Sequence, residues 1–518
     1  MSKNPTLSAT RMVSLGTASS RALGLLRSIL MASLFGTTLA QSVFVIAFRI
    51  PNLFRRLFGE GAMSAAFIPV FADTLEKDGL AEANRLAGRV ASLLGVTLAM
   101  IVAGGLLVIL SMRYWAPIGD RADLFLTLLG IMLPYLFFIC LVALCMAMLN
   151  SFHHFFVPAF TPLILNIVWI ATLLWIAPRF GDRPEERIHG VAWGILAAGA
   201  LQLLAQFPAL AKFGIRPPLL FSLRDERLQR VLRAMGPAAI GMGVFQINVL
   251  VDGFLAWWVA DWAPAALGFA EIIVYLPLGI FGTALGTVLL PVFSRQAARN
   301  AEDGIRNTLA QSLAGLMTIM IPAAFGLMVL ARPVVQLIYE WPGREFDALS
   351  TLQTARALIF YAPGLIVFGA YKTLVPAFYA LKDTRTPVRV GMGVVGLNFM
   401  LNVLFILTWP TDFKHAGLAC ATVLASAINC AILLWLLQRK IGALVWRPVA
   451  KTMIVSLLAA GMMAVAVHTF HAWIGPYAAR AAGLPLKAQE ALCVGAAIAL
   501  GMLIYGAVHF ALRPKNNA

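Results

Sequence analysis

Long apolar blocks alternate with short polar segments along the chain, and this pattern is typical of membrane-spanning helices. Eight blocks contain no Asp, Glu, Lys or Arg: 90–112, 188–211, 272–294, 307–331, 390–411, 415–438, 452–479 and 491–512. Each is long enough to cross a hydrocarbon core of ~30 Å as a helix. Residues 124–178 are also free of charge, and "NSFHHFFVP" divides them into two spans.

Weaker segments complete the series of spans. They are an amphipathic helix at 10–36, a broken segment at 40–71, a segment at 234–260 that contains Asp252, and a segment at 350–381. The sequence therefore predicts an all-α polytopic membrane protein with about fourteen transmembrane helices, inserted without a cleaved signal peptide.

The distribution of basic residues orients these spans. With both termini on one side, the termini and the even-numbered loops hold 23 Lys and Arg residues, whereas the odd-numbered loops hold 10. Cytoplasmic segments carry the excess of Lys and Arg. We therefore expect both termini to lie in the cytoplasm.

The composition narrows the function classes. The chain of 518 residues is 60% hydrophobic and 12% charged, with a net charge of +17. Its basic residues are scattered over many short loops, which excludes the single basic face of a nucleic-acid-binding domain. The five cysteines lie inside apolar blocks without metal-ligand spacing, so no metal site and no cofactor is expected beyond a coupling Na⁺ or proton.

Short sequences of the first half recur in order in the second half. "GAMSAAFIPVF" is echoed by "GTALGTVLLPVF", "LPYLFF" by "APGLIVF", Leu165-Asn166 by Leu397-Asn398, and "HGVAWG" by "HAGLAC", at offsets of 222 to 232 residues. Six spans per copy give both copies the same orientation. This predicts two six-helix lobes with pseudo-two-fold symmetry about the membrane normal, 1–216 and 217–440, with two extra helices at 441–518.

Arginines inside the membrane spans are the main functional signal. A charge at bilayer depth costs at least ~2.5–3.5 kcal/mol, so such residues usually face a cavity or a partner. The candidates are Arg21, Arg27, Arg49, Arg55 and Arg56, with Glu60 as a neighbouring acid. Arg binds phosphate through two parallel hydrogen bonds, so the cluster predicts an anionic substrate such as a diphosphate.

Part of this cluster has a simpler interpretation. Arg49 and Arg56 could extend to lipid headgroups at the cytoplasmic interface, and Glu60 could serve as a counter-ion for an adjacent arginine. Pro51 is expected to break the helix between these residues. Arg21 and Arg27 lie deeper, about ten and sixteen residues inside the first helix, and are harder to explain in this way.

Polar oxygen-bearing side chains recur in the other lobe. Asp252, Asn398, Asn402 and Thr422 lie in apolar surroundings, and Asn398 and Asn402 are four residues apart on one helix face. One carboxylate with amide and hydroxyl oxygens suits Na⁺ or a proton. Ordinary hydrogen bonding between helices explains the same residues equally well.

Several motifs resemble the MurJ/MviN family of lipid II flippases, in the multidrug/oligosaccharidyl-lipid/polysaccharide exporter superfamily. They are "SRALGLLRSILMASLFG", "FRIPNLFRRLFGEGAMSAAFIPVF", "GTALGTVLLPVFS" and "LVPAFYALKDTRTPV". The resemblance implies a transporter of the bacterial inner membrane and not an enzyme. It would flip lipid II, an undecaprenyl-diphosphate-linked precursor, from the cytoplasmic to the periplasmic leaflet by alternating access, and we expect it to act as a monomer.

The resemblance also implies roles for residues. Ser20, Arg21, Arg27 and Arg55 match family residues that line the cavity, Asp252, Asn398, Asn402 and Thr422 match a sodium site, and the last two spans match a groove for the lipid tail. The chain departs from the family at Ser28, Ser42, Ile272 and Tyr275, where acids or an arginine are usual.

Three other functions are alternatives. A flippase for another polyprenyl-diphosphate oligosaccharide, such as an O-antigen or exopolysaccharide precursor, would fit the same charges and differs only in its substrate. A cation-coupled drug antiporter would need a cavity of the opposite sign. A polyprenyl-phosphate glycosyltransferase would need an acidic metal-binding motif or a sizeable loop, and the longest loop, 212–233, has neither.

Overall fold

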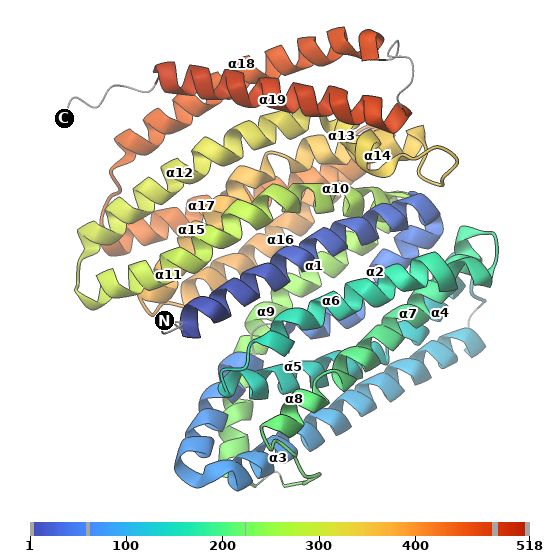
Figure 1. Ribbon diagram of the computed structural model, residues 1–518, viewed down its shortest axis with the longest axis vertical. Coiled ribbons are helices and arrows are strands. Elements are labelled where there is room, and N and C mark those ends of the chain that lie inside the picture. The colour runs from blue at the N-terminus through green and yellow to red at the C-terminus, as the bar shows by residue number, and fades with distance from the viewer. Residues whose placement is uncertain (1–4, 58–62, 116, 223, 479–484, 513–518) are drawn as a thin grey trace. The chain divides into compact units, whose positions relative to one another are not determined.

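The computed structural model describes residues 5–57, 63–115, 117–222, 224–478 and 485–512, and all regular elements within them are helical. The chain divides into two compact units, Met1–Phe254 and Leu255–Ala518. Figure 1 shows the helices that make up each unit. The all-α polytopic architecture expected from the apolar blocks is confirmed. The predicted lobe boundaries at 216 and 440 stay a prediction.

The first unit contains eight helices and most of a ninth. They are α1 (Pro5–Phe35), α2 (Leu39–Phe54), α3 (Met63–Trp115), α4 (Asp120–Met132), α5 (Tyr135–Ser151), α6 (Phe156–Ala171), α7 (Pro184–Leu204), α8 (Phe207–Lys212) and α9 (Glu226–Val259). Short turns η2 (Thr172–Ile176) and η3 (Ala177–Phe180) extend α6. Helix α1 packs along α6, and α3 packs along α5. The α1–α6 pair positions the first group of candidate residues.

The second unit contains the remaining helices. They are α10 (Ala263–Pro277), η4 (Leu278–Gly282), α11 (Thr283–Ala298), α12 (Glu302–Val329), α13 (Ala331–Tyr339), α14 (Ala348–Tyr361), α15 (Gly364–Ala380), α16 (Arg385–Thr408), η5 (Thr411–Phe413), α17 (Lys414–Ile441), α18 (Trp446–Ala478) and α19 (Leu486–Leu512). Figure 1 shows α18 and α19 as a hairpin, and α18 packs along both α12 and α19.

The predicted spans are found in the described residues. Ten helical stretches are long and apolar enough to cross a membrane, and α14 with α15, bent by 45°, forms an eleventh. Helix α1, helix α2 with the start of α3, and helix α9 account for the other three of the fourteen predicted spans. The eighth span begins at Ala263, earlier than the predicted 272, because Glu271 is accommodated inside α10.

Two units with matching irregularities agree with the duplication seen in the sequence. A π-helical turn follows Pro51 at 55–57, and another, η4, follows Pro277. The chain also breaks before α5 at Pro134 and before α15 at Pro363. Proline withholds a backbone donor, so each copy relaxes its helix at equivalent positions.

One ion pair closes the turn between α15 and α16. Asp383 accepts hydrogen bonds from Thr386 through its backbone N–H, at 3.0 Å, and its hydroxyl, at 2.6 Å, and it pairs with Lys440 on α17. Desolvation alone raises the pKa of Asp383, but the bonds from Lys440 and Thr386 outweigh it and lower the pKa to about 2. The carboxylate therefore stays ionised and joins three helices at one end of the unit.

Candidate functional site

Arg27 is held by a network between α1 and α6. Its Nη1 donates a hydrogen bond to Oδ1 of Asn166 at 3.0 Å, and its guanidinium carbon lies 4.2 Å from the ring centroid of Trp169. Asn166 in turn donates through Nδ2 to the backbone oxygen of Ser20 at 3.0 Å and to its Oγ at 3.3 Å. Asn166 thus ties the guanidinium to the α1 backbone almost two turns earlier.

Aromatic side chains surround the Arg27 network. The ring of Trp169 makes edge contacts with Phe44 and Phe48 of α2, at centroid distances of 5.5 and 5.3 Å. Tyr135, which is fully buried, lies 6.2 Å from Phe48. In these apolar surroundings an electrostatic contact is stronger than it is in water, and the guanidinium has one preferred orientation.

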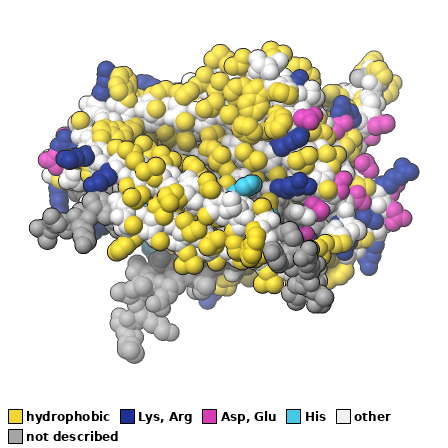
Figure 2. Space-filling view, turned by 90° about the horizontal axis from the view of Figure 1, so that it is seen from above, with side chains coloured by type: hydrophobic (Ala, Val, Ile, Leu, Met, Phe, Trp, Pro, Cys, Tyr) yellow, Lys and Arg dark blue, Asp and Glu magenta, His cyan; other side chains and the backbone are white. Residues whose placement is uncertain are grey.

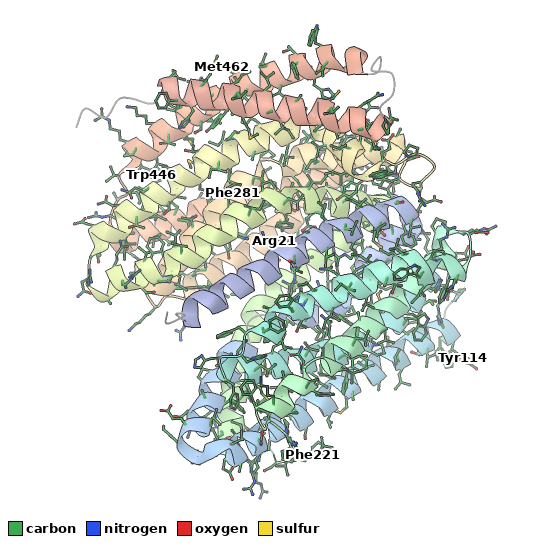
Figure 3. All side chains as sticks on the ribbon, in the orientation of Figure 1. Arg21, Tyr114, Phe221, Phe281, Trp446 and Met462 are labelled. Carbon is green, nitrogen blue, oxygen red and sulfur yellow. The ribbon has the colours of Figure 1, made fainter. Side chains whose placement is uncertain are left out.

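Arg21 lies on the same helix as Arg27, in the middle of α1, where Figure 3 labels it. Six residues separate the two, which corresponds to about 9 Å along the helix axis. Arg21 is half-buried and takes part in interactions within the protein. The nearby Ser28 is buried, and its Oγ donates to the backbone oxygen of Gly24 at 2.9 Å.

The arginines at the end of α2 have different partners. Arg55 donates through Nε to Oδ1 of Asn52 at 2.7 Å. Arg56 is exposed, and its Nη1 lies 3.4 Å from Oε1 of Gln246 on α9. The expected break at Pro51 is not found: α2 continues through the proline to Phe54, and a π-helical turn follows at 55–57. Glu60 lies outside the described residues.

Arg49 reaches α9. Its Nη1 donates to the backbone oxygen of Val249 at 3.0 Å, and a Cβ atom on Gly253 would lie only 2.8 Å from the same nitrogen. Gly253 therefore leaves the space that the guanidinium occupies. Arg49 is thus bonded to a neighbouring helix at the turn that carries Asp252, which a side chain extended only toward lipid headgroups would not do.

The candidate ion ligands lie on three helices. Asp252 on α9 accepts a hydrogen bond from Nδ2 of Asn248 at 3.2 Å. Asn398 and Asn402 lie one turn apart on α16 and are buried, with exposures of 3% and 0%. Thr422 on α17 donates to the backbone oxygen of Leu418 at 3.0 Å, and its lone pairs remain able to accept or to coordinate.

The positions that depart from the family pattern are structurally diverse. Ser42 is fully buried on α2, whereas Tyr275 on α10 is half exposed. Ile272 and Glu271 are partly buried on the same helix. These positions therefore do not share one kind of environment: Ser42 is packed, Ile272 is partly buried, and Tyr275 is exposed.

Sequence reasoning missed Asn166 and Trp169 as functional residues. In the sequence, Asn166 stands out only as part of the repeated Leu-Asn pair, and Trp169 lies within the apolar block 124–178. The available signal was their spacing: residues 166 and 169 share a helix face, and an amide with an indole at that spacing suits a guanidinium partner. Only the packing of α6 on α1 shows which arginine they hold.

Comparison with solved structures identifies the fold first. The fold is similar to an inward-facing multidrug resistance MATE family transporter of the MOP superfamily, with a TM-score of 0.69 and 13% identity over 82% of this chain and 94% of that one. This likeness gives the fold alone. The chain therefore shares the all-helical fold of that membrane transporter.

The sequence gives the particular family. The chain belongs to the MurJ family of lipid II flippases, whose family model matches residues 31–479. It is 36% identical over 466 residues to a probable lipid II flippase MurJ of Rhizobium tropici, covering 88% of this chain and 86% of the relative. The corresponding protein of Vibrio cholerae is 35% identical over 433 residues, covering 81% of each chain. A solved lipid II flippase MurJ, in an inward closed conformation, matches with a TM-score of 0.77 and 25% identity over 96% of this chain and 97% of that one.

Proposed function

We propose that this protein is a transporter that flips lipid II from the cytoplasmic to the periplasmic leaflet of a bacterial inner membrane for cell wall synthesis. Membership of the MurJ family and the named activity of the matched relatives support this substrate. The protein acts by alternating access and as a monomer. Its termini face the cytoplasm, which is the side favoured by the Lys and Arg bias of the loops.

The observation that carries the proposal is the preorganised guanidinium of Arg27. Arginine has five N–H donors, and within the described residues Arg27 uses one of them, for Asn166. The remaining donors can bind phosphate oxygens in parallel while Asn166 and Trp169 fix the plane of the group. The diphosphate of lipid II has this geometry and charge. Ser20, Arg21, Arg55, Arg56 and Glu60 complete the proposed substrate-binding set.

The coupling ion is a second part of the proposal. Asn398 and Asn402 present amide groups on one face of a membrane helix, and Asp252 adds a carboxylate, which is the ligand chemistry of Na⁺ or of a proton site. These three residues, with Thr422, are the proposed ion ligands. Asp252 belongs to the first unit and the other three to the second, so the proposal rests on their ligand chemistry. The ion would supply the free energy that drives the lobes between their two conformations.

Complementation in a strain depleted of its own flippase tests the proposal. Arg21→Ala and Arg27→Ala should reach normal membrane levels and fail to complement, with lipid II accumulating on the cytoplasmic side. The lysine variants should be partly defective, because lysine keeps the charge but loses the planar fork. Arg230→Ala is the matched control, since Arg230 is exposed on α9 and its ion-pair partner among the described residues is the distant Glu226, at 4.0 Å.

The result that would contradict the proposal is full complementation by well-expressed Arg21→Ala and Arg27→Ala. Accumulation of another polyprenyl-diphosphate oligosaccharide upon depletion, with lipid II unaffected, would reassign the substrate. The complementation result is read at equal membrane levels of the variants.

A further inference from the structure

A polar groove lies between α12, α18 and α19, at the end of the second unit where α18 begins. Its volume is about 600 Å³. Its polar lining comes from all three helices: Gln311, Thr318, Arg447, Lys451, Thr452 and His509. The lining is thus basic and rich in hydrogen-bond donors, although it belongs to helices that otherwise expose apolar side chains to the bilayer.

The floor of this groove is held by hydrogen bonds. Tyr505 of α19 donates to the backbone oxygen of Thr318 at 2.7 Å, and its hydroxyl also lies 3.2 Å from Oγ of Ser456. The ring of His509 stacks on Tyr505 with 5.4 Å between centroids. One side chain therefore joins the three helices beneath the groove, so the groove keeps its shape.

Two basic side chains lie at the open end of the groove. Arg447 and Lys451 are exposed on the first turns of α18, and within the described residues neither forms an ion pair. The backbone N–H groups at the start of a long helix add positive potential at the same place. The groove is consequently suited to an anion.

Tryptophans place the groove at the level of lipid headgroups. Trp446 donates through Nε1 to Oε1 of Gln438 at 3.2 Å, and Arg439 lies over the ring of Trp435 at 3.8 Å. Tryptophan with adjacent arginine is typical of the boundary between membrane and water. Lipid phosphates lie at this depth.

An apolar stripe continues from the cations along α18. Ile454, Leu458, Met462 and Val465 follow Lys451 at helical spacing and are 54%, 56%, 57% and 67% exposed. From Lys451 to Met462, labelled in Figure 3, the helix rises about 16 Å, close to half of a ~30 Å hydrocarbon core. Figure 2 looks onto α18 and α19, and hydrophobic side chains dominate the middle of that face.

We propose that this groove binds the phosphate headgroup of an anionic glycerophospholipid, with its acyl chains along the α18 stripe. The basic mouth, the interfacial depth and the leaflet-long apolar stripe match the three parts of such a lipid. Basic pockets between transmembrane helices at the cytoplasmic side bind lipid headgroups in this way. The bound lipid bridges α12 and the α18–α19 hairpin and stabilises their packing. The proposal does not rest on the proposed function, although α18 and α19 are also the two spans to which the resemblance assigns the lipid II tail, and it places its lipid in the cytoplasmic leaflet.

Thermal unfolding of the purified full-length protein with added phosphatidylglycerol tests the site. Wild type should be stabilised by phosphatidylglycerol and much less by phosphatidylcholine, and inorganic phosphate should have no effect. The double variant Arg447→Gln/Lys451→Gln should bind phosphatidylglycerol about 30-fold more weakly, because each surface cation contributes about 1 kcal/mol. Lys451→Arg should retain binding.

The matched control is Arg385→Gln/Arg389→Gln, which removes the same charge from the first turns of α16, away from the groove. Equal loss of binding in both double variants would overturn the site, because the effect would then be general surface charge. Equal stabilisation by phosphatidylcholine, a response to inorganic phosphate, or a response to polyprenyl diphosphate alone would each overturn the assignment to an anionic phospholipid.

Discussion

The variant Asn166→Ala should keep the positive charge of Arg27 but remove the hydrogen bond that fixes the orientation of its guanidinium. Asn166 is 6% exposed and makes three contacts: it accepts from Arg27 at 3.0 Å and donates to Ser20 at 3.0 and 3.3 Å. Alanine removes all three, and among the described residues Arg27 then keeps its contact with Trp169. The guanidinium then stays in place but can rotate over the ring.

Two effects of this substitution differ in size. Polar contacts between membrane helices contribute on average only about 0.6 kcal/mol to stability, so the folded protein should be only slightly destabilised. A hydrogen bond to a charged group contributes about 1.5–3 kcal/mol, and losing part of one to misorientation should weaken lipid II binding about tenfold. Affinity should therefore fall far more than thermal stability.

Binding of lipid II to purified variants, measured beside their thermal unfolding, checks this expectation. Gln202→Ala is the control: Gln202 is 2% exposed and donates to the backbone oxygen of Thr161 at 2.9 Å, so it also joins α7 to α6, away from Arg27. Asn166→Asp should bind lipid II most weakly while staying folded, because its carboxylate would pair with the guanidinium. Equal affinities of Asn166→Ala and Gln202→Ala would refute the positioning role.

Three further predictions address other parts of the molecule. The pKa of Asp383 is lowered to about 2 from an ordinary value of ~3.9, so its pairing stabilises the fold fully above about pH 4, and this stabilisation is lost as the pH falls toward 2. Lys440→Gln should therefore weaken the dependence of thermal unfolding on acid pH, and an unchanged pH profile in this variant would contradict the prediction. Asp252→Ala should abolish stabilisation by Na⁺ relative to choline, and an unchanged Na⁺ response would reduce the residue to helix packing. Cysteine labelling should reach 212–233 from the cytoplasm and 340–347 from the periplasm, and a periplasmic C-terminus would contradict the orientation.

The helical architecture could be predicted because membrane spans follow from length and apolarity alone. The eleven most apolar spans are found as expected. Their internal breaks were harder to locate, since a proline shows that a hydrogen bond is lost but not where the helix adjusts. Pro51 illustrates this: α2 runs through it, and the π-helical turn follows at 55–57.

The candidate site could be predicted only in part. The cost of burying charge singles out Arg21 and Arg27 from the sequence, but not their partners. Asn166 lies 139 residues from Arg27, and its contact depends on how α6 packs against α1. Arg49 likewise reads as an interfacial residue until α9 is seen to offer it a carbonyl oxygen and the space left by Gly253.

Translocation by the purified protein tests the central claim most directly. Proteoliposomes would carry lipid II with a fluorophore on its peptide, and a membrane-impermeant reductant would report how much faces outward. Wild-type protein should carry lipid II from the inner to the outer leaflet, so the reductant should eventually quench both pools. Arg27→Ala should slow this translocation at least tenfold. Protection of the inner-leaflet pool in vesicles that contain correctly folded wild type, or equal rates for wild type and Arg27→Ala, would contradict the account.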